Sequence, residues 1–131
     1  MSDAKELQRE RRRTIRHKVK VRIEMIIRYA IAGVWSESTL NVKGRVLDLS
    51  TDGCRLFTKK QFDQGQELRL TIYMPWQPKV VSQAIVRWCK PLPEKEGYAS
   101  GVSFKGLPEK GLKVIAKFLD RLESKIAAHI R

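Results

Sequence analysis

Two short polar segments of this 131-residue chain combine residue types that bind phosphate groups and nucleobases. The first, residues 11–16, reads Arg-Arg-Arg-Thr-Ile-Arg and places Arg12 and Arg16 four positions apart. A guanidinium group is a planar fork of donors that can grip two phosphate oxygens, meet the O6 and N7 atoms of guanine, or stack on a purine. Taken alone, such a segment is more often a generic basic tail.

The second segment, residues 48–53, reads Asp-Leu-Ser-Thr-Asp-Gly. The carboxylate of Asp48 can accept hydrogen bonds from the ring N–H and amino groups of guanine. The Ser50 hydroxyl can serve a phosphate, a base edge or the turn itself, and Gly53 permits a positive φ and a close approach. Taken alone, this segment is more often an ordinary hairpin turn, because Asp, Ser and Gly are common turn residues.

The charge balance predicts an anionic partner. The chain has 27 Lys and Arg residues against 14 Asp and Glu residues, a formal net charge of +13. An excess of this size favours nucleic acid, a phosphorylated small molecule, an acidic protein or a membrane surface. Much of it lies in the N-terminal stretch, where residues 1–17 carry few large aliphatic side chains and cannot bury enough surface to order themselves. We therefore expect residues 1–17 to form a flexible basic arm.

The rest of the chain, residues 18–131, reads as one mainly β domain. Val19, Val21, Ile23 and Met25 alternate with polar residues, which predicts a half-buried strand beginning at Lys18. Further strands are expected at residues 42–49, 54–58, 68–74, 80–89 and 98–104, with a hairpin turn at 52–53 and a loop at 91–97. A helix is expected from Pro108 to about Ala128, with an apolar stripe formed by Leu112, Ile115, Leu119, Leu122 and Ile126. Short successive strands before one helix predict an antiparallel barrel or sandwich with the helix packed on it.

The patterns of enzymes and metalloproteins are not found in the sequence. His17 and His129 are far apart, and Cys54 and Cys89 form no CxxC motif, so the cysteines are interpreted as small buried hydrophobes. No nucleophile has an obvious base, and we expect neither an enzyme nor a cofactor. No apolar run approaches the ~20 residues that span a bilayer. The polar start does not read as a secretory signal, so the cytoplasm is the expected location.

The two segments together resemble the paired signature of the PilZ domain family. That signature is RxxxR, then about thirty residues, then DxSxxG, and here Arg16 and Asp48 are 32 positions apart. Residues 86–88 (Val-Arg-Trp) and residues 101–104 (Gly-Val-Ser-Phe) also resemble strands of that family, and the C-terminal helix follows as it does there. The resemblance covers residues from about 10 to 122.

This resemblance implies a six-stranded antiparallel β-barrel with a C-terminal helix that binds cyclic di-GMP, a bacterial second messenger. The arm would wrap the ligand against the barrel, with Arg12 and Arg16 contacting phosphates and guanine edges. Asp48 and Ser50 would bind guanine and help to fix the loop, and Gly53 would allow the turn. In the family, the residue before RxxxR influences whether one ligand or a stacked pair binds. That residue is Arg11 here, and its extra charge favours a pair.

Trp88 is a weaker candidate for the site. Its indole could stack on a guanine if it faces the same edge of the barrel, and it could equally be a core or surface tryptophan.

Three functions fit these observations. The favoured one is a cyclic di-GMP receptor, monomeric or dimeric, whose arm changes conformation on binding and alters the surface read by an unidentified effector protein. The second is a nucleic-acid-binding barrel, which is less favoured because the charge lies largely in the arm and the strands show no obvious row of exposed aromatics. The third is a PilZ-like scaffold that contacts proteins without binding the ligand.

Overall fold

The computed structural model describes residues 22–30, 33–35 and 41–130, with side chains as far as residue 124. The arm at residues 1–17 and the predicted strand residues before Arg22 lie outside the described residues, so the proposed division at residue 17 stays a prediction. The described elements are the strands β1 (Glu24–Tyr29), β2 (Asn41–Leu49), β3 (Gly53–Thr58), β4 (Glu67–Tyr73), β5 (Val80–Leu92) and β6 (Gly97–Lys105), the short 3-10 helix η1 (Pro93–Lys95) and the helix α2 (Glu109–Ile130).

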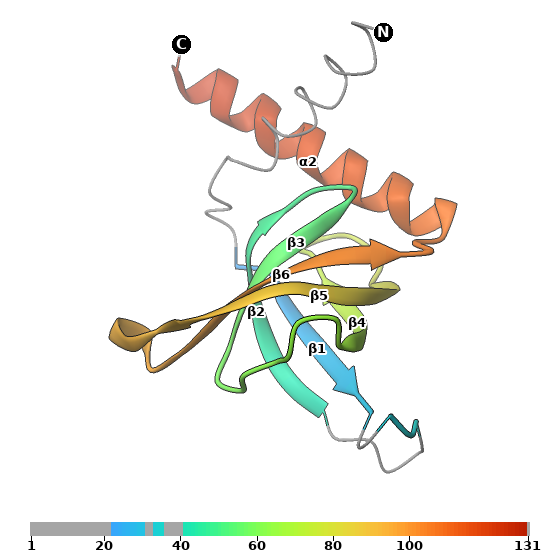
Figure 1. The fold of residues 1–131 in the computed structure, drawn as a ribbon. Coiled ribbons are helices and arrows are strands. Elements are labelled where there is room, and N and C mark those ends of the chain that lie inside the picture. Colours follow the sequence, from blue (N-terminus) through green and yellow to red (C-terminus); the bar gives the residue numbers. More distant parts are fainter. Residues whose placement is uncertain (1–21, 31–32, 36–40, 131) are drawn as a thin grey trace, which may run out of the picture.

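The strands form a closed barrel in the order β1-β2-β3-β6-β5-β4, and every neighbouring pair is antiparallel. Helix α2 lies across one end of this barrel (Figure 1). The prediction of a mainly β fold, a six-stranded antiparallel barrel with a C-terminal helix, is therefore confirmed. Closure leaves no unpaired sheet edge within the barrel, and it gives the molecule an apolar interior and a polar outer face.

The interior of the barrel is filled by the alternate residues of each strand. In and next to β1, Ile23, Met25 and Ile27 are at most 1% exposed, and they continue the alternation that the sequence shows. Leu56 of β3 and Leu70 of β4 are equally buried. Burying an aliphatic side chain of this size contributes about 1.5–3 kcal/mol, so this interior is what holds the outer face in place.

Helix α2 covers the barrel with part of the predicted stripe. Ile115 and Leu119 are buried, and Leu122 is half-buried. Phe118, which the predicted stripe omitted, is also buried, whereas Leu112 is exposed and Ile126 lies beyond the described side chains. The contact face therefore begins about one turn later than predicted. None of the helices in the described part of the chain is long and apolar enough to cross a membrane.

The strands extend further than the sequence predicted. Strand β1 reaches Tyr29, and β5 runs three residues past Cys89, so the expected loop at 91–97 is reduced to the 3-10 helix η1 and the turn at residue 96. Pro91 pairs with Tyr98 in a long β5–β6 hairpin that projects from the barrel (Figure 1). Strand β4 pairs only with residues 80–85 of β5, so no strand in the described part of the chain pairs with Pro91 on its other side. Proline, which has no N–H to donate, is tolerated in a strand at such an edge.

Candidate ligand-binding site

Two β-bulges place the candidate site on the outer face of the barrel. The pairing of β2 with β3 shifts register between Val46 and Asp48, and the pairing of β5 with β6 shifts between Val86 and Trp88. Val46 and Val86 are buried, so strict alternation would turn the residues two positions later, Asp48 and Trp88, inward as well. The extra residue in each strand reverses this alternation. Asp48 and Trp88 therefore both line one outer groove.

The groove has a volume of about 480 Å³ and crosses β2, β3, β6 and β5. Four positions form a continuous cross-strand row along it, because Asp48 pairs with Arg55, Arg55 with Gly101, and Gly101 with Trp88. The turn residues Ser50, Asp52 and Gly53 and the neighbouring residues Cys54, Arg87, Val102 and Ser103 complete its lining. The second sequence segment and Trp88 are therefore brought together, as the stacking hypothesis for Trp88 required.

Asp48 is held by an arginine that the sequence reasoning missed. The Arg55 Nε donates to the Asp48 Oδ2 at 2.9 Å, and the Asp48 side chain is only 17% exposed. Partial burial raises the pKa of Asp48 above its ordinary value, and the positive charge and hydrogen bonds of Arg55 oppose that rise. The carboxylate is therefore fixed in position and poorly hydrated. Such a group is well placed to accept a hydrogen bond from a donor on a ligand.

Ser50 organises the turn between β2 and β3. Its buried hydroxyl oxygen accepts hydrogen bonds from the backbone N–H groups of Asp52 at 3.0 Å and Gly53 at 3.1 Å, and it donates to the Gly53 carbonyl at 3.2 Å. The Asp52 carbonyl in turn accepts from the backbone N–H of Phe104 at 2.9 Å, which ties the turn to β6. These hydrogen bonds give a geometric basis to the prediction that Ser50 fixes the loop. The predicted direct contact between Ser50 and guanine stays a prediction.

Gly53 acts by close approach and not by the predicted positive φ. Among the described glycines only Gly33, Gly65 and Gly106 have a positive φ, so the expectation for Gly53 was wrong in this respect. Gly53 is the first residue of β3 and pairs with Ser103. A Cβ atom at this position would lie 2.1 Å from the Val102 carbonyl oxygen. The two strands can approach this closely only because the position has no side chain.

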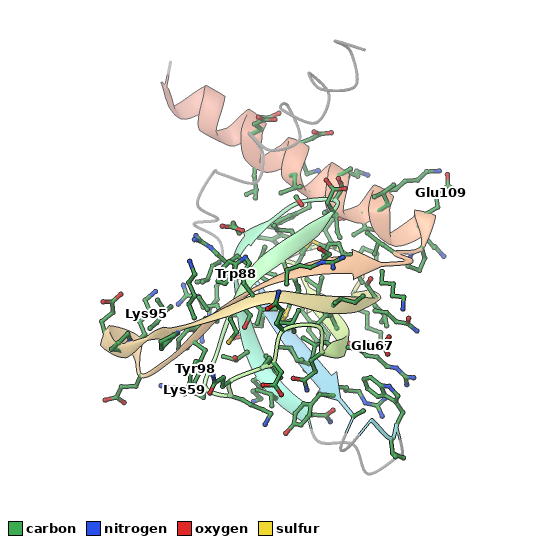
Figure 2. All side chains as sticks on the ribbon, viewed as in Figure 1. Lys59, Glu67, Trp88, Lys95, Tyr98 and Glu109 are labelled. Carbon is green, nitrogen blue, oxygen red and sulfur yellow. The ribbon has the colours of Figure 1, made fainter. Side chains whose placement is uncertain are left out.

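Trp88 lies against a second glycine. A Cβ atom at Gly101 would lie 2.2 Å from the indole Nε1, so the ring occupies the space above that glycine. Its other contacts include the Lys90 Nζ, which is 5.5 Å from the ring centroid. Trp88 is 36% exposed and sits where β5 crosses the middle of the barrel (Figure 2). Part of the indole is therefore available to a planar ligand.

Replacing Gly101 with alanine is expected to push the Trp88 indole away from β6. Overpacking of this kind costs about 1–3 kcal/mol of folding free energy. In a chain whose other two tryptophans, Trp35 and Trp76, are changed to phenylalanine, the emission of Trp88 should shift and the unfolding midpoint should fall. An emission spectrum identical to that of the Gly101 parent would contradict this packing.

A second arginine lies on the opposite side of the groove. Arg87 is the extra residue of the β5 bulge, and its Nε donates to the Ser103 Oγ at 3.0 Å. The groove thus has Asp48 and Arg55 at one end, and Arg87 and Trp88 at the other. Arg55 belongs to no sequence motif, and Arg87 lies in the Val-Arg-Trp segment but was not predicted as a site residue. The strand register reveals the place of both. The predicted arm residues Arg11, Arg12 and Arg16 lie outside the described residues.

The cysteines do not add a reactive group to the groove. Cys54 is buried, as predicted, and burial raises the pKa of its thiol, an effect to which the charge of Asp48 adds. The thiol therefore stays protonated and unreactive at neutral pH. Cys89 is only half-buried, which corrects the prediction that both are buried, because it follows the β5 bulge. Among the described residues, no group of His, Cys, Asp and Glu could hold a metal ion.

Comparison with known proteins settles the family. The family model for the PilZ domain matches residues 10–121, which include both sequence segments and the whole barrel. The chain belongs to the PilZ domain family. No curated protein matches this PilZ domain chain.

Solved structures share its fold at low sequence identity. The inhibitor of motility MotI/DgrA of Bacillus subtilis is 15% identical with a TM-score of 0.65, and the match covers 82% of this chain and 50% of that one. MrkH of K. pneumonia in its apo state is 20% identical with a TM-score of 0.62, over 86% and 53% of the two chains. The PilZ domain of Escherichia coli YcgR, solved with c-di-GMP, is 10% identical with a TM-score of 0.60, over 88% and 98%. The chain thus spans about half the length of MotI and MrkH.

Proposed function

We propose that this PilZ domain is a receptor for cyclic di-GMP, and that the ligand lies in the groove across β2, β3, β6 and β5. The observation that carries the proposal is the cross-strand row from Asp48 to Trp88, which offers an acceptor, a cation and an aromatic face in one groove. The YcgR PilZ domain of similar fold was solved with this ligand, and another structural neighbour, MrkH, is described as a c-di-GMP-dependent transcription regulatory factor.

The groove complements guanine in particular. An ionised carboxylate can only accept hydrogen bonds, and the Watson–Crick edge of guanine presents the N1–H and N2 amino donors. Adenine presents an acceptor at N1, which a carboxylate would repel. Arg55 already holds one oxygen of Asp48, so the carboxylate keeps its orientation when a base arrives. Asp48 is therefore the group that selects guanine.

The phosphates require more positive charge than the groove holds. Arg55 and Arg87 flank the floor of the groove, and the arm would add Arg11, Arg12 and Arg16 from the other side of the ligand. Three closely spaced arm arginines match the charge of two stacked ligands better than that of one. We therefore propose a stacked pair for each chain, with the ligand ordering the arm and an effector protein reading the altered surface.

Titration calorimetry with cyclic di-GMP tests the receptor function and the stoichiometry together. We expect binding by the full chain with two ligands for each chain. Arg16→Ala should abolish the heat, whereas Arg13→Ala, a matched loss of one charge at a variable position inside RxxxR, should retain most of it. No heat at micromolar protein would reject the receptor, and equal losses in the two variants would show that only the net charge of the arm matters.

The affinity for cyclic di-GMP should fall in acid. Burial raises the pKa of Asp48 in the free protein above its ordinary value of 3.8, and the guanine donors favour the ionised carboxylate, so binding releases a proton. Affinity is then constant at neutral pH and falls by up to about tenfold per pH unit below the raised pKa. Calorimetry between pH 7 and pH 4 measures the slope. Asp48→Asn should remove it, and a slope that persists in this variant would assign the proton to another group.

A further inference from the structure

A second groove lies on another part of the outer face, across β4, β1, β2 and β3. It has a volume of about 380 Å³ and shares no lining residue with the ligand groove. The strand register builds it as one row, because Tyr73 pairs with Glu24, Glu24 with Arg45, and Arg45 with Phe57. We call it the β1–β2 groove. The linear sequence separates these residues by up to 49 positions, and pairing alone places them side by side.

The β1–β2 groove is strongly positive. Arg22, Lys43, Arg45 and Lys59 line it, and Glu24 is the one acid among its lining residues. Glu24 is paired with Arg22 at 3.2 Å, whereas Lys43 and Arg45 are exposed and make no ion pair with any described residue. The side chains of Lys43 and Arg45, in the centre of the groove, can therefore bind an anionic ligand.

Lys59 adds a third charge in a fixed position. Its Nζ is 3.3 Å from the Lys95 carbonyl oxygen and 3.4 Å from that of Glu96, and it lies 5.8 Å from the centroid of the Phe57 ring. Figure 2 shows Lys59 near the projecting end of the β5–β6 hairpin. The groove is therefore positive from its centre to this edge.

Its shape and aromatic content favour a chain of nucleotides. Tyr73 is 43% exposed at one end of the row, and the half-buried Ile26 and Phe57 add apolar surface. Three inter-strand spacings separate β4 from β3, so the row is about 14 Å long. Successive cations along an open groove suit repeated phosphates, and an exposed aromatic ring beside them suits stacking of a base.

We propose that the β1–β2 groove binds single-stranded nucleic acid without strong sequence preference, separately from the cyclic di-GMP site. Lys43, Arg45 and Lys59 contact the phosphates, and Tyr73 stacks on a base. This inference does not rest on the receptor function, because the two grooves share no residue.

The test uses a labelled 12-nucleotide oligothymidylate and fluorescence anisotropy over a series of salt concentrations. The parent is the full chain with Arg11, Arg12 and Arg16 changed to alanine, so that the arm does not mask the groove. Lys43→Ala/Arg45→Ala should weaken binding at least tenfold and reduce the salt slope by about 1.4, since each single-strand phosphate contact contributes about 0.7. Lys110→Ala/Lys117→Ala on α2 removes the same charge and should change affinity less than twofold.

Two further measurements decide between a nucleic acid and other anions. Tyr73→Ala removes a stacking surface but no charge, and it should weaken oligothymidylate binding about tenfold with an unchanged salt slope. Polyglutamate of equal charge should compete poorly. Equal losses in the two double variants, no effect of Tyr73→Ala, or equally tight polyglutamate binding would each overturn the proposal. Competition by free cyclic di-GMP that is lost with Lys43→Ala/Arg45→Ala would instead make the groove a second nucleotide site.

Discussion

Asp48→Asn is expected to weaken the affinity for cyclic di-GMP at least a hundredfold, to a level that calorimetry at high protein concentration still measures. Asparagine has nearly the same shape, but it replaces one acceptor with an NH₂ donor that would face the donors of guanine. The ionic component is lost at the same time, and a buried hydrogen bond to a charged group is worth about 1.5–3 kcal/mol. A repulsive donor pair adds to that loss.

The same change should leave the fold intact. Burial raises the pKa of Asp48, so the folded chain binds a proton at this carboxyl group more tightly than the unfolded chain does. The ionised carboxylate therefore opposes folding at neutral pH. The amide oxygen of the introduced asparagine would still accept from Arg55, so we expect the free energy of unfolding to change by less than about 1 kcal/mol. Asp63→Asn, the same change outside the groove, is the control. Retained binding by the Asp48 variant would place guanine elsewhere.

Gly53→Ala is expected to destabilise the barrel and to abolish binding together. The new Cβ would meet the Val102 carbonyl oxygen at 2.1 Å and the Ser103 Cα at 3.1 Å, so β3 and β6 must separate. Both contacts are with backbone atoms, which cannot rotate away. We expect a loss of about 3 kcal/mol in the free energy of unfolding, at the upper end of overpacking effects. Denaturant unfolding with calorimetry of the ligand measures both consequences.

Gly65 provides the matched control. It has a φ of 86°, and a Cβ atom added there would meet open space, so Gly65→Ala should cost only the backbone conformation, about 1 kcal/mol. Asparagine tolerates this region better than alanine, so Gly65→Asn should recover part of that loss. Gly53→Asn should be no better than Gly53→Ala. Rescue of position 53 by asparagine would mean that conformation, and not space, excludes a side chain there.

The barrel could be predicted because its main determinant is local. Alternation of apolar and polar residues at 19–25 indicates which face of the first strand is buried, and a closed antiparallel sheet is a general way to bury one face of many short strands. The apolar stripe of the helix is equally local, although its register was predicted one turn too early. Pro91 was assigned to a loop because a strand tolerates proline only where no neighbouring strand needs its N–H. Whether such a strand lies beside Pro91 depends on the tertiary structure, and among the described residues β4 pairs with residues 80–85 of β5 only.

Part of the candidate site could also be predicted. Asp48 and the turn that follows it were identified from residue types and spacing, since a short turn motif keeps its chemistry together along the chain. Arg55 and Arg87 were missed, because their place beside Asp48 and Trp88 depends on which strands pair and in which register. The sequence motif identifies Asp48 as the candidate acceptor. The strand pairing places Arg55 and Arg87, which orient and surround it.

The sequence by itself determined a basic arm motif, a turn that carries a carboxylate acceptor, and a barrel followed by a helix, because each is encoded by neighbouring residues. The tertiary structure decided which way the site faces. Strict alternation from Val46 and Val86 would bury Asp48 and Trp88, and only the two bulges turn both of them outward. A bulge arises from the mismatch between paired strands, so its position is a property of the pair and not of either strand alone.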